Sequence, residues 1–169
     1  MIFVIIGMHE EPFDRLLKYM DNWAGMHEEE VILQTGFSDY EPKNCKWKKM
    51  FSVEEMEELR KKARITITHG GPSSFMPVVQ SGRVPIVVPR KHELGEHVND
   101  HQVIFCTTYE KEYGGIIVVD DVNEIDGIIH DYEQINKEKS KSIKSHNKQF
   151  CEDFAKVVDI VFDEKYKLK

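Results

Sequence analysis

The stretch Ile65-Thr66-Ile67-Thr68-His69-Gly70-Gly71-Pro72-Ser73-Ser74 decides the fold, because it runs from a β-rich segment through two glycines into a helix start. Residues 65–68 predict a strand. Pro72 suits the first turn of a helix, where its missing N–H leaves no hydrogen bond unmade. We expect this helix to reach about Ser81, with Gly82 ending it. The stretch therefore predicts a strand, a tight glycine loop and a helix in succession.

The same succession recurs on both sides of this stretch. Expected strands are Ile2–Ile6, Val31–Gln34, Val84–Val88 and Ile116–Val119, with a shorter one at Met50-Phe51. Expected helices cover about 12–23, 53–62 and 97–107, the second opened by a capping box of Ser52 and Glu55. The alternation predicts the α/β class: a single Rossmann-like domain with a parallel sheet of five or six strands and helices on both faces.

Length and composition narrow the class of protein. The chain has 169 residues, 40% of them hydrophobic, which suits one folded core and argues against disorder. Its net charge of −7 argues against nucleic-acid binding, which favours a basic surface. We expect one domain over 1–169, with the α/β core at about 1–120 and a charged helical segment at about 121–169.

Cysteine usage and hydropathy predict a cytoplasmic protein. Cys45, Cys106 and Cys151 lack metal-ligand spacing and are expected to be reduced thiols. The apolar run Met1–Ile6 is too short for a signal peptide or a membrane span, and no run reaches about 18 apolar residues. A role at a membrane would therefore need another protein as its anchor.

Polar segments follow four of the expected strands. Ligands of parallel α/β sheets bind at the carboxyl ends of the strands, so these segments are expected to surround one site. They are Gly7–Glu10, Thr35–Asp39, His69–Ser74 and Pro89–Gln102.

The His69–Ser74 loop favours an anion site. Gly70 and Gly71 let the backbone approach a ligand, and Ser73 and Ser74 place hydroxyl and N–H groups at a helix N-terminus. A diphosphate would fit there, although a tight turn with a capping serine explains the same residues. Neither a dinucleotide-binding glycine pattern nor a P-loop is present.

The segment Pro89–Gln102 has three interpretations. His97 and His101 are four apart and would share a helix face, as zinc ligands do, but without the glutamate of the HExxH pattern. Alternatively, its Glu and Gln side chains could bind sugar hydroxyls, with Arg90 near phosphate. A solvated helix face is the third interpretation.

His9 and Glu10 follow the first expected strand. His9 could transfer a proton or donate to phosphate. Both residues could equally mark a helix start, because the positive end of a helix dipole stabilises a carboxylate such as that of Glu10.

Near the C-terminus, apolar residues at helical spacing form an amphipathic stripe: Phe150, Phe154, Val157, Val158, Val161 and Phe162. That stripe could pack on the chain's own sheet or dock a partner.

Several separated segments together resemble one family, the small bacterial glycosyltransferase subunits of capsule and exopolysaccharide assembly. These are similar to the C-terminal donor-binding half of the GT-B enzymes of family 28 and to the soluble catalytic subunit of the eukaryotic two-subunit N-acetylglucosaminyltransferase. The resemblance covers about residues 1–120. Its segments are Gly7–Leu16, Gln34–Gly36, Thr68–Gly71, Val88–Arg90, Gly95–His97 and Asp100–Gln102.

The resemblance implies a UDP-sugar donor and no metal or other cofactor. His69, Gly70, Gly71, Ser73 and Ser74 would cradle the diphosphate, and Gly7 and His9 would close the site. Asp100, His101 and Gln102 would reach the sugar, supported by Glu96 and Arg90, and His9 is the candidate general base. The family pattern differs at Met8, Ser73 and Val78, the last of which leaves the ribose without its usual acidic partner.

It further implies a heteromer. A membrane-anchored partner subunit would bind the lipid-linked acceptor and recruit the chain to the inner face of the cell membrane. The expected reaction is inverting transfer of a hexose, with galactose in a β-1,4 linkage preferred. A non-catalytic enhancer subunit is the alternative function. Without its partner, the chain could pair with itself as a homodimer.

Overall fold

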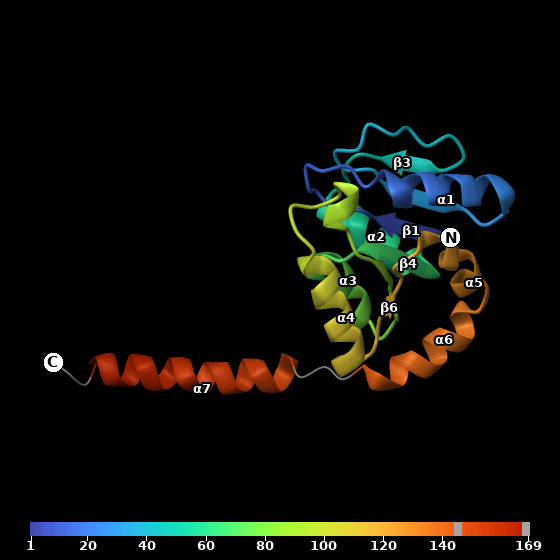
Figure 1. Ribbon diagram of the computed structural model, residues 1–169. Helices are drawn as coiled ribbons and strands as arrows, with labels where there is room; N and C mark the ends of the chain where they lie inside the picture. Colours follow the sequence, from blue (N-terminus) through green and yellow to red (C-terminus); the bar gives the residue numbers. More distant parts are fainter. Residues whose placement is uncertain (144–146, 167–169) are drawn as a thin grey trace.

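The computed structural model describes residues 1–143 and 147–166 and contains a six-stranded parallel sheet of order β3-β2-β1-β4-β5-β6 (Figure 1). The strands are β1 Ile2–Ile5, β2 Val31–Gln34, β3 Lys46–Lys48, β4 Ile65–His69, β5 Ile86–Val88 and β6 Ile117–Val118. Every strand pair is parallel. The predicted α/β class and parallel sheet are confirmed, with six strands.

Helices connect and cover the strands. The α-helices are α1 Asp14–Met26, α2 Val53–Lys62, α3 Pro72–Gln80, α4 His101–Tyr113, α5 Ile125–His130, α6 Tyr132–Lys139 and α7 Asn147–Tyr166. Short 3-10 turns lie at η1 His92–Leu94, η2 Val122–Glu124 and η3 Ser140–Ser142. The predicted capping box of α2 is present, with Ser52 and Glu55 each accepting a hydrogen bond from the other's backbone N–H.

Two layers of helices enclose the sheet, as predicted. On one face α1, α5 and α6 bury Leu16, Ile125 and Tyr132 against alternate side chains of the central strands. On the other face, α3 and α4 pack Phe75 and Cys106 over β5, while α2 covers β1. Apolar burial of this kind is the main stabilising contribution of such a core.

The chain order places a topological switch point beside β1. After β1 the chain builds β2 and β3 on one side, and α2 then carries it across to β4 on the other side. Loops that leave neighbouring strands in opposite directions separate at such a point, where α/β proteins bind ligands. We use "carboxyl edge" for the three loops after β1, β4 and β5, residues 7–11, 70–71 and 89–100, together with the first turns of α3 and α4.

The predicted strand at Met50-Phe51 is wrong, because the strand lies at Lys46–Lys48 instead. β3 is an edge strand paired only with β2, and all three of its side chains are exposed. An edge strand held by backbone hydrogen bonds needs no apolar pattern, so hydrophobicity pointed to the wrong residues.

Helix boundaries also differ from the prediction. α4 begins at His101 and continues to Tyr113, so His97 is not on it, and the shared helix face expected for His97 and His101 does not exist. Gly95 in the left-handed conformation and η1 fold the preceding residues into a loop. α1 begins at Asp14, two residues after Pro12, and runs on to Met26.

The helical segment after residue 121 is divided into short helices and one long one. α5 and α6 pack on the sheet, whereas α7 extends away from the domain (Figure 1). Phe150 is 66% exposed and Phe154 58% exposed. The apolar stripe of α7 therefore does not pack on the sheet, and the interpretation that it does is wrong for the residues described.

Candidate functional site

The His69 ring lies between two glycines at the carboxyl edge. A Cβ atom on Gly7 would lie 2.6 Å from the ring, and one on Gly71 would lie 2.3 Å from its Nε2 atom. Gly7 also has φ +78°, a conformation that favours glycine. The loops after β1 and β4 thus contact each other through the His69 imidazole. A side chain on either glycine would displace this ring.

Burial keeps His69 uncharged. Its side chain is 8% exposed, and its Nδ1 atom lies 3.4 Å from the Ile5 carbonyl oxygen. Desolvation, followed by the positive charge of Arg90, lowers the pKa of His69 to about 4. A neutral imidazole here can position the glycine loops, but it contributes no cation to an anion site near neutral pH.

Gln102 holds the glycine loop from the first turn of α4. Its Oε1 atom accepts hydrogen bonds from the backbone N–H of Gly70 at 3.0 Å and of Arg90 at 3.2 Å. Gly70 has to be a glycine, because a Cβ there would lie 2.9 Å from Cys106 Sγ. Gln102 therefore connects the ends of β4 and β5.

The first turn of α3 offers donors to an anion. Gly71 is its N-cap residue and no side chain caps it, while Pro72 stands in the first turn. Ser73 is exposed and Ser74 is 8% exposed. Uncapped N–H groups and the helix dipole favour a negative ligand at this position.

Arg90 binds the protein rather than facing solvent. Its guanidinium is fully buried and donates to the carbonyl oxygens of Ile6, Glu11 and Glu96 at 2.8, 2.7 and 2.9 Å. Desolvation lowers its pKa to about 10, so it keeps its charge at neutral pH. Arg90 joins the loop after β1 to the loop after β5 and adds a positive charge beneath both.

Glu96 has an internal partner that the sequence did not reveal. Its carboxylate accepts from Arg15 Nε and Nη2, both at 3.0 Å, and from the Lys91 N–H at 3.0 Å. Arg15 lies on α1 and also donates to the Pro89 carbonyl at 3.1 Å. Glu96 is 4% exposed, so the pair fixes the loop after β5 onto α1.

Three histidine rings contact one another in a row across the carboxyl edge, with interplanar angles of 43° and 75° rather than parallel planes; we call this row the histidine stack. The rings of His9 and His97 lie 4.3 Å apart, and those of His97 and His101 lie 4.5 Å apart. Glu11 contacts His9, and Asn99 bonds His101 through its Oδ1 atom at 2.6 Å. The roles of His97, Asn99 and Glu11 were missed, because only the folded loops bring them together.

Asp100 is exposed and serves as an internal acceptor as well. Its Oδ1 atom accepts from the backbone N–H of His92 at 2.8 Å, which stabilises the turn of η1. Its second carboxylate oxygen and the exposed His101 ring stand at the start of α4. Of the three predicted sugar contacts, Asp100 and His101 have exposed side chains, whereas the side chain of Gln102 is buried.

The profile of the glycosyltransferase family 28 C-terminal domain matches residues 1–160. This chain belongs to glycosyltransferase family 28. It is the sugar-donor-binding domain of that family, whose members generally use UDP-sugar donors without a metal ion.

A solved structure shows the corresponding fold. The crystal structure of Acinetobacter baumannii MurG superposes with a TM-score of 0.55 at 16% sequence identity, covering 85% of this chain and 45% of that chain. The family-28 domain thus has the fold of one half of a GT-B enzyme and spans less than half of the MurG chain. No curated protein matches it significantly.

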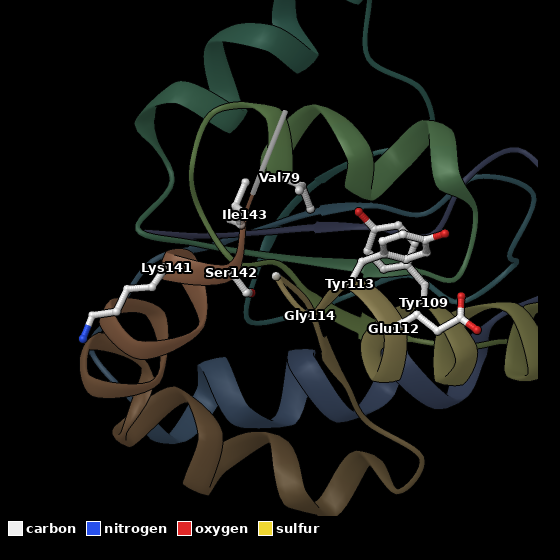
Figure 2. A pocket seen from close by; sticks show the side chains of 9 residues that line it. Val79, Tyr109, Glu112, Tyr113, Gly114, Lys141, Ser142 and Ile143 are labelled. Carbon is white, nitrogen blue, oxygen red and sulfur yellow. The ribbon is translucent and has the colours of Figure 1, made fainter. Parts of the chain in front are cut away.

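A cavity of about 610 Å³ lies away from the carboxyl edge of this family-28 domain (Figure 2). It is lined by Tyr109 and Tyr113 of α4, by Gly114 before β6, and by Ser142 and Ile143. Because Gly114 precedes β6, the cavity lies toward the amino ends of the strands. Ligands of parallel sheets bind at the opposite ends, so we do not assign the donor to this cavity.

Within residues 1–143 and 147–166, no group of three or more His, Cys, Asp or Glu side chains could hold a metal ion. No helix in the same residues is both long and apolar enough to cross a bilayer.

Proposed function

We propose that the chain is the catalytic, UDP-sugar-binding subunit of a two-component glycosyltransferase. It transfers a hexose to a lipid-linked saccharide in capsule or exopolysaccharide synthesis. The proposed transferred sugar is galactose and the proposed bond is a β-1,4 linkage, because the capsule-assembly subunits that the sequence resembles form this linkage. The acceptor is bound by a separate, membrane-anchored partner, which recruits the chain to the inner face of the cell membrane.

The observation that carries the proposal is the glycine-lined carboxyl edge within a family-28 donor domain. Gly70 is buried and fixed by Gln102, and the partly exposed Gly71 leads directly into the uncapped N-terminus of α3. A diphosphate placed there would accept from the Ser73 N–H and from the Ser73 and Ser74 hydroxyls, since Pro72 has no N–H and the Ser74 N–H donates to the Gly71 carbonyl. These donors also stabilise the negative charge that develops on departing UDP.

The remaining site residues divide into ligand contacts and supports. Asp100 and His101 are proposed to contact the sugar hydroxyls. Gln102 supports Gly70 through its Oε1 atom, so its amide group has only the Nε2 donors left for the sugar. Arg90 and Glu96 hold the loops through the contacts described above.

His9 is the proposed general base, and its side chain is 36% exposed. The acceptor hydroxyl would attack the anomeric carbon as the bond from that carbon to the UDP oxygen breaks, which inverts the configuration. The imidazole takes the hydroxyl proton, and UDP leaves with the bonding electron pair. Glu11 contacts the same ring and can orient it toward the hydroxyl.

Helix α7 is the proposed docking element for the partner. Its apolar side chains are exposed along the helix, including Val157 and Val161 at 55% and 56%. Among residues 149–162 of α7, whose side chains the structure describes, three are acidic and one is a lysine, 3 − 1 = 2 more acidic than basic. An acidic polar face disfavours an anionic lipid surface, so a protein groove is the better-matched occupant.

A transfer assay tests this function. UDP-galactose labelled in the sugar is added to membranes that contain the acceptor-binding partner, with and without the purified chain. We expect lipid-linked product only when both are present, and a loss of about 100-fold or more for His9→Ala. Full transfer by the membranes alone would contradict the proposal. Undiminished stimulation by His9→Ala and Gly71→Ala would instead indicate an enhancer subunit.

A further inference from the structure

The middle member of the histidine stack has no role in the proposed function. His97 comes from the loop after β5, is 7% exposed and lies between His9 and His101. His9 belongs to the loop after β1, and His101 begins α4. One buried ring therefore connects the proposed base to the proposed sugar contact, across loops from two different strands.

The charged groups around the stack are mostly cationic or titratable to cations. Arg90 after β5 interacts electrostatically with His97, and His69 at the end of β4 does so with His9 and His97. Glu11 supplies the opposing charge from the loop after β1. Desolvation, followed by the charges of His9, His101 and Arg90, lowers the pKa of His97. A second positive charge in this stack is unfavourable unless an anion is added.

Resting on the proposed function, we propose that His97 is a positioning residue of the diphosphate subsite, which holds His9 and His101 in one stack and couples diphosphate binding to the uptake of a proton. The proton comes from the buffer and is bound at a ring nitrogen of the stack other than those of His9, which stays neutral as the general base; no covalent bond between heavy atoms forms or breaks. The diphosphate adds negative charge to that of Glu11, because its proposed position is beside His69, which interacts electrostatically with His9 and His97.

The direction of the pH dependence follows from this coupling. If the complex holds more protons than the free protein, lower pH favours the complex. Affinity should therefore fall as pH rises, by up to about tenfold per pH unit for one linked proton. UDP itself is a poor probe, because its terminal phosphate titrates near pH 6, about where histidine does. A UDP-sugar has a diphosphate diester that does not titrate there, so any proton taken up belongs to the protein.

The experiment is calorimetric titration of the full chain with UDP-galactose, UDP-glucose and UDP-N-acetylglucosamine between pH 5.5 and 8. At each pH, two buffers of different ionisation enthalpy give the number of protons taken up. We expect net uptake and weaker binding at higher pH for the UDP-sugar that binds best. His97→Gln, which cannot titrate, should reduce the uptake and flatten the pH profile. His130→Gln, at an exposed histidine ending α5, should leave both unchanged.

Each outcome bears on one of the two proposals. Binding without proton uptake, or uptake that persists unchanged in His97→Gln, overturns the role of His97 and leaves the donor site intact. Absence of UDP-sugar binding at every pH overturns the proposed function and this inference with it. If His97→Gln does not fold, His101→Gln is measured instead, because its exposed ring can be changed with less effect on packing; unchanged uptake there overturns the stack as the proton acceptor.

Discussion

Gln102 Oε1 accepts the backbone N–H of Gly70 at 3.0 Å, and this hydrogen bond joins the first turn of α4 to the loop in which the donor diphosphate is proposed to lie. The same oxygen accepts from Arg90 N–H, and both N–H groups are buried. A single side-chain carbonyl thereby sets the spacing between the ends of β4 and β5. The shape of the carboxyl edge therefore depends on internal hydrogen bonds of the protein as well as on contacts with the ligand.

Replacing Gln102 with leucine should destabilise the domain and weaken donor binding together. Leucine keeps a similar volume but removes the acceptor, leaving two buried donors unpaired. We expect a loss of about 2 kcal/mol in the free energy of unfolding, measured by urea denaturation. Gln134→Leu, at an exposed site on α6, is the matched control and should change it by less than about 0.5 kcal/mol. Equal unfolding curves for both variants would refute the bridging role.

Gly71→Ala should reduce UDP-sugar affinity by about tenfold or more, equivalent to about 1.4 kcal/mol. Its φ of −78° suits alanine, so backbone strain is not the reason. The added Cβ would lie 2.3 Å from His69 Nε2 and must displace the ring or the loop. Gly127→Ala in α5 is the control, since its Cβ would meet no atom within 4 Å. Calorimetric titration measures the UDP-sugar affinity of both variants. Equal affinities would show that the packing of His69 between Gly7 and Gly71 does not shape the site.

Buried neutral His69 should make stability fall on acidification. Its folded-state pKa of about 4 lies below the unfolded value of about 6.5, so the unfolded chain binds the proton first. Stability is then constant above pH 6.5 and decreases toward pH 4. We expect a loss of about 2 kcal/mol between pH 6.5 and 5, with His97 contributing in the same direction. Denaturation of His69→Gln over this range should give a clearly shallower slope; an unchanged slope would contradict the assignment.

Helix α7 should be dispensable for the fold and required for partner binding. A chain ending at Ile143 should unfold at the same temperature as the full chain, because the apolar side chains of α7 are exposed rather than packed on the sheet. Phe154→Asp should abolish co-purification with the acceptor-binding partner. Lys156→Ala, on the opposite side of the helix, should not. A large drop in melting temperature on truncation would instead place α7 in the domain's own core.

Local sequence patterns predicted some elements closely. Strand β2 and helix α2 have the predicted bounds, since a short apolar run and a capping box are local signals. β3 was misplaced because a three-residue edge strand of two lysines and an exposed tryptophan carries no such signal. α4 starts later than its pattern suggested, because Gly95 and tertiary contacts fold the preceding loop.

The carboxyl edge was predictable as a place, whereas its internal contacts were not. The polar segments after β1, β4 and β5 do meet, as parallel topology requires. Arg90 reaches the Ile6 carbonyl across 84 residues of sequence, and Glu96 pairs with Arg15 across 81. Pairs so distant in the chain leave no local pattern. The buried, supporting positions of Arg90 and Glu96 therefore emerged only from the fold.

The most direct test of the account is a heteronuclear NMR titration of the chain with UDP-galactose, UDP-glucose and UDP-N-acetylglucosamine. We predict saturable shifts for at least one of them, concentrated in the amides of Gly7, Gly70, Gly71, Ser73 and Ser74 and of residues 97–102. Shifts that concentrate around Tyr109, Gly114 and Ile143, or no saturable shift with any of the three, would contradict a donor site at the carboxyl edge.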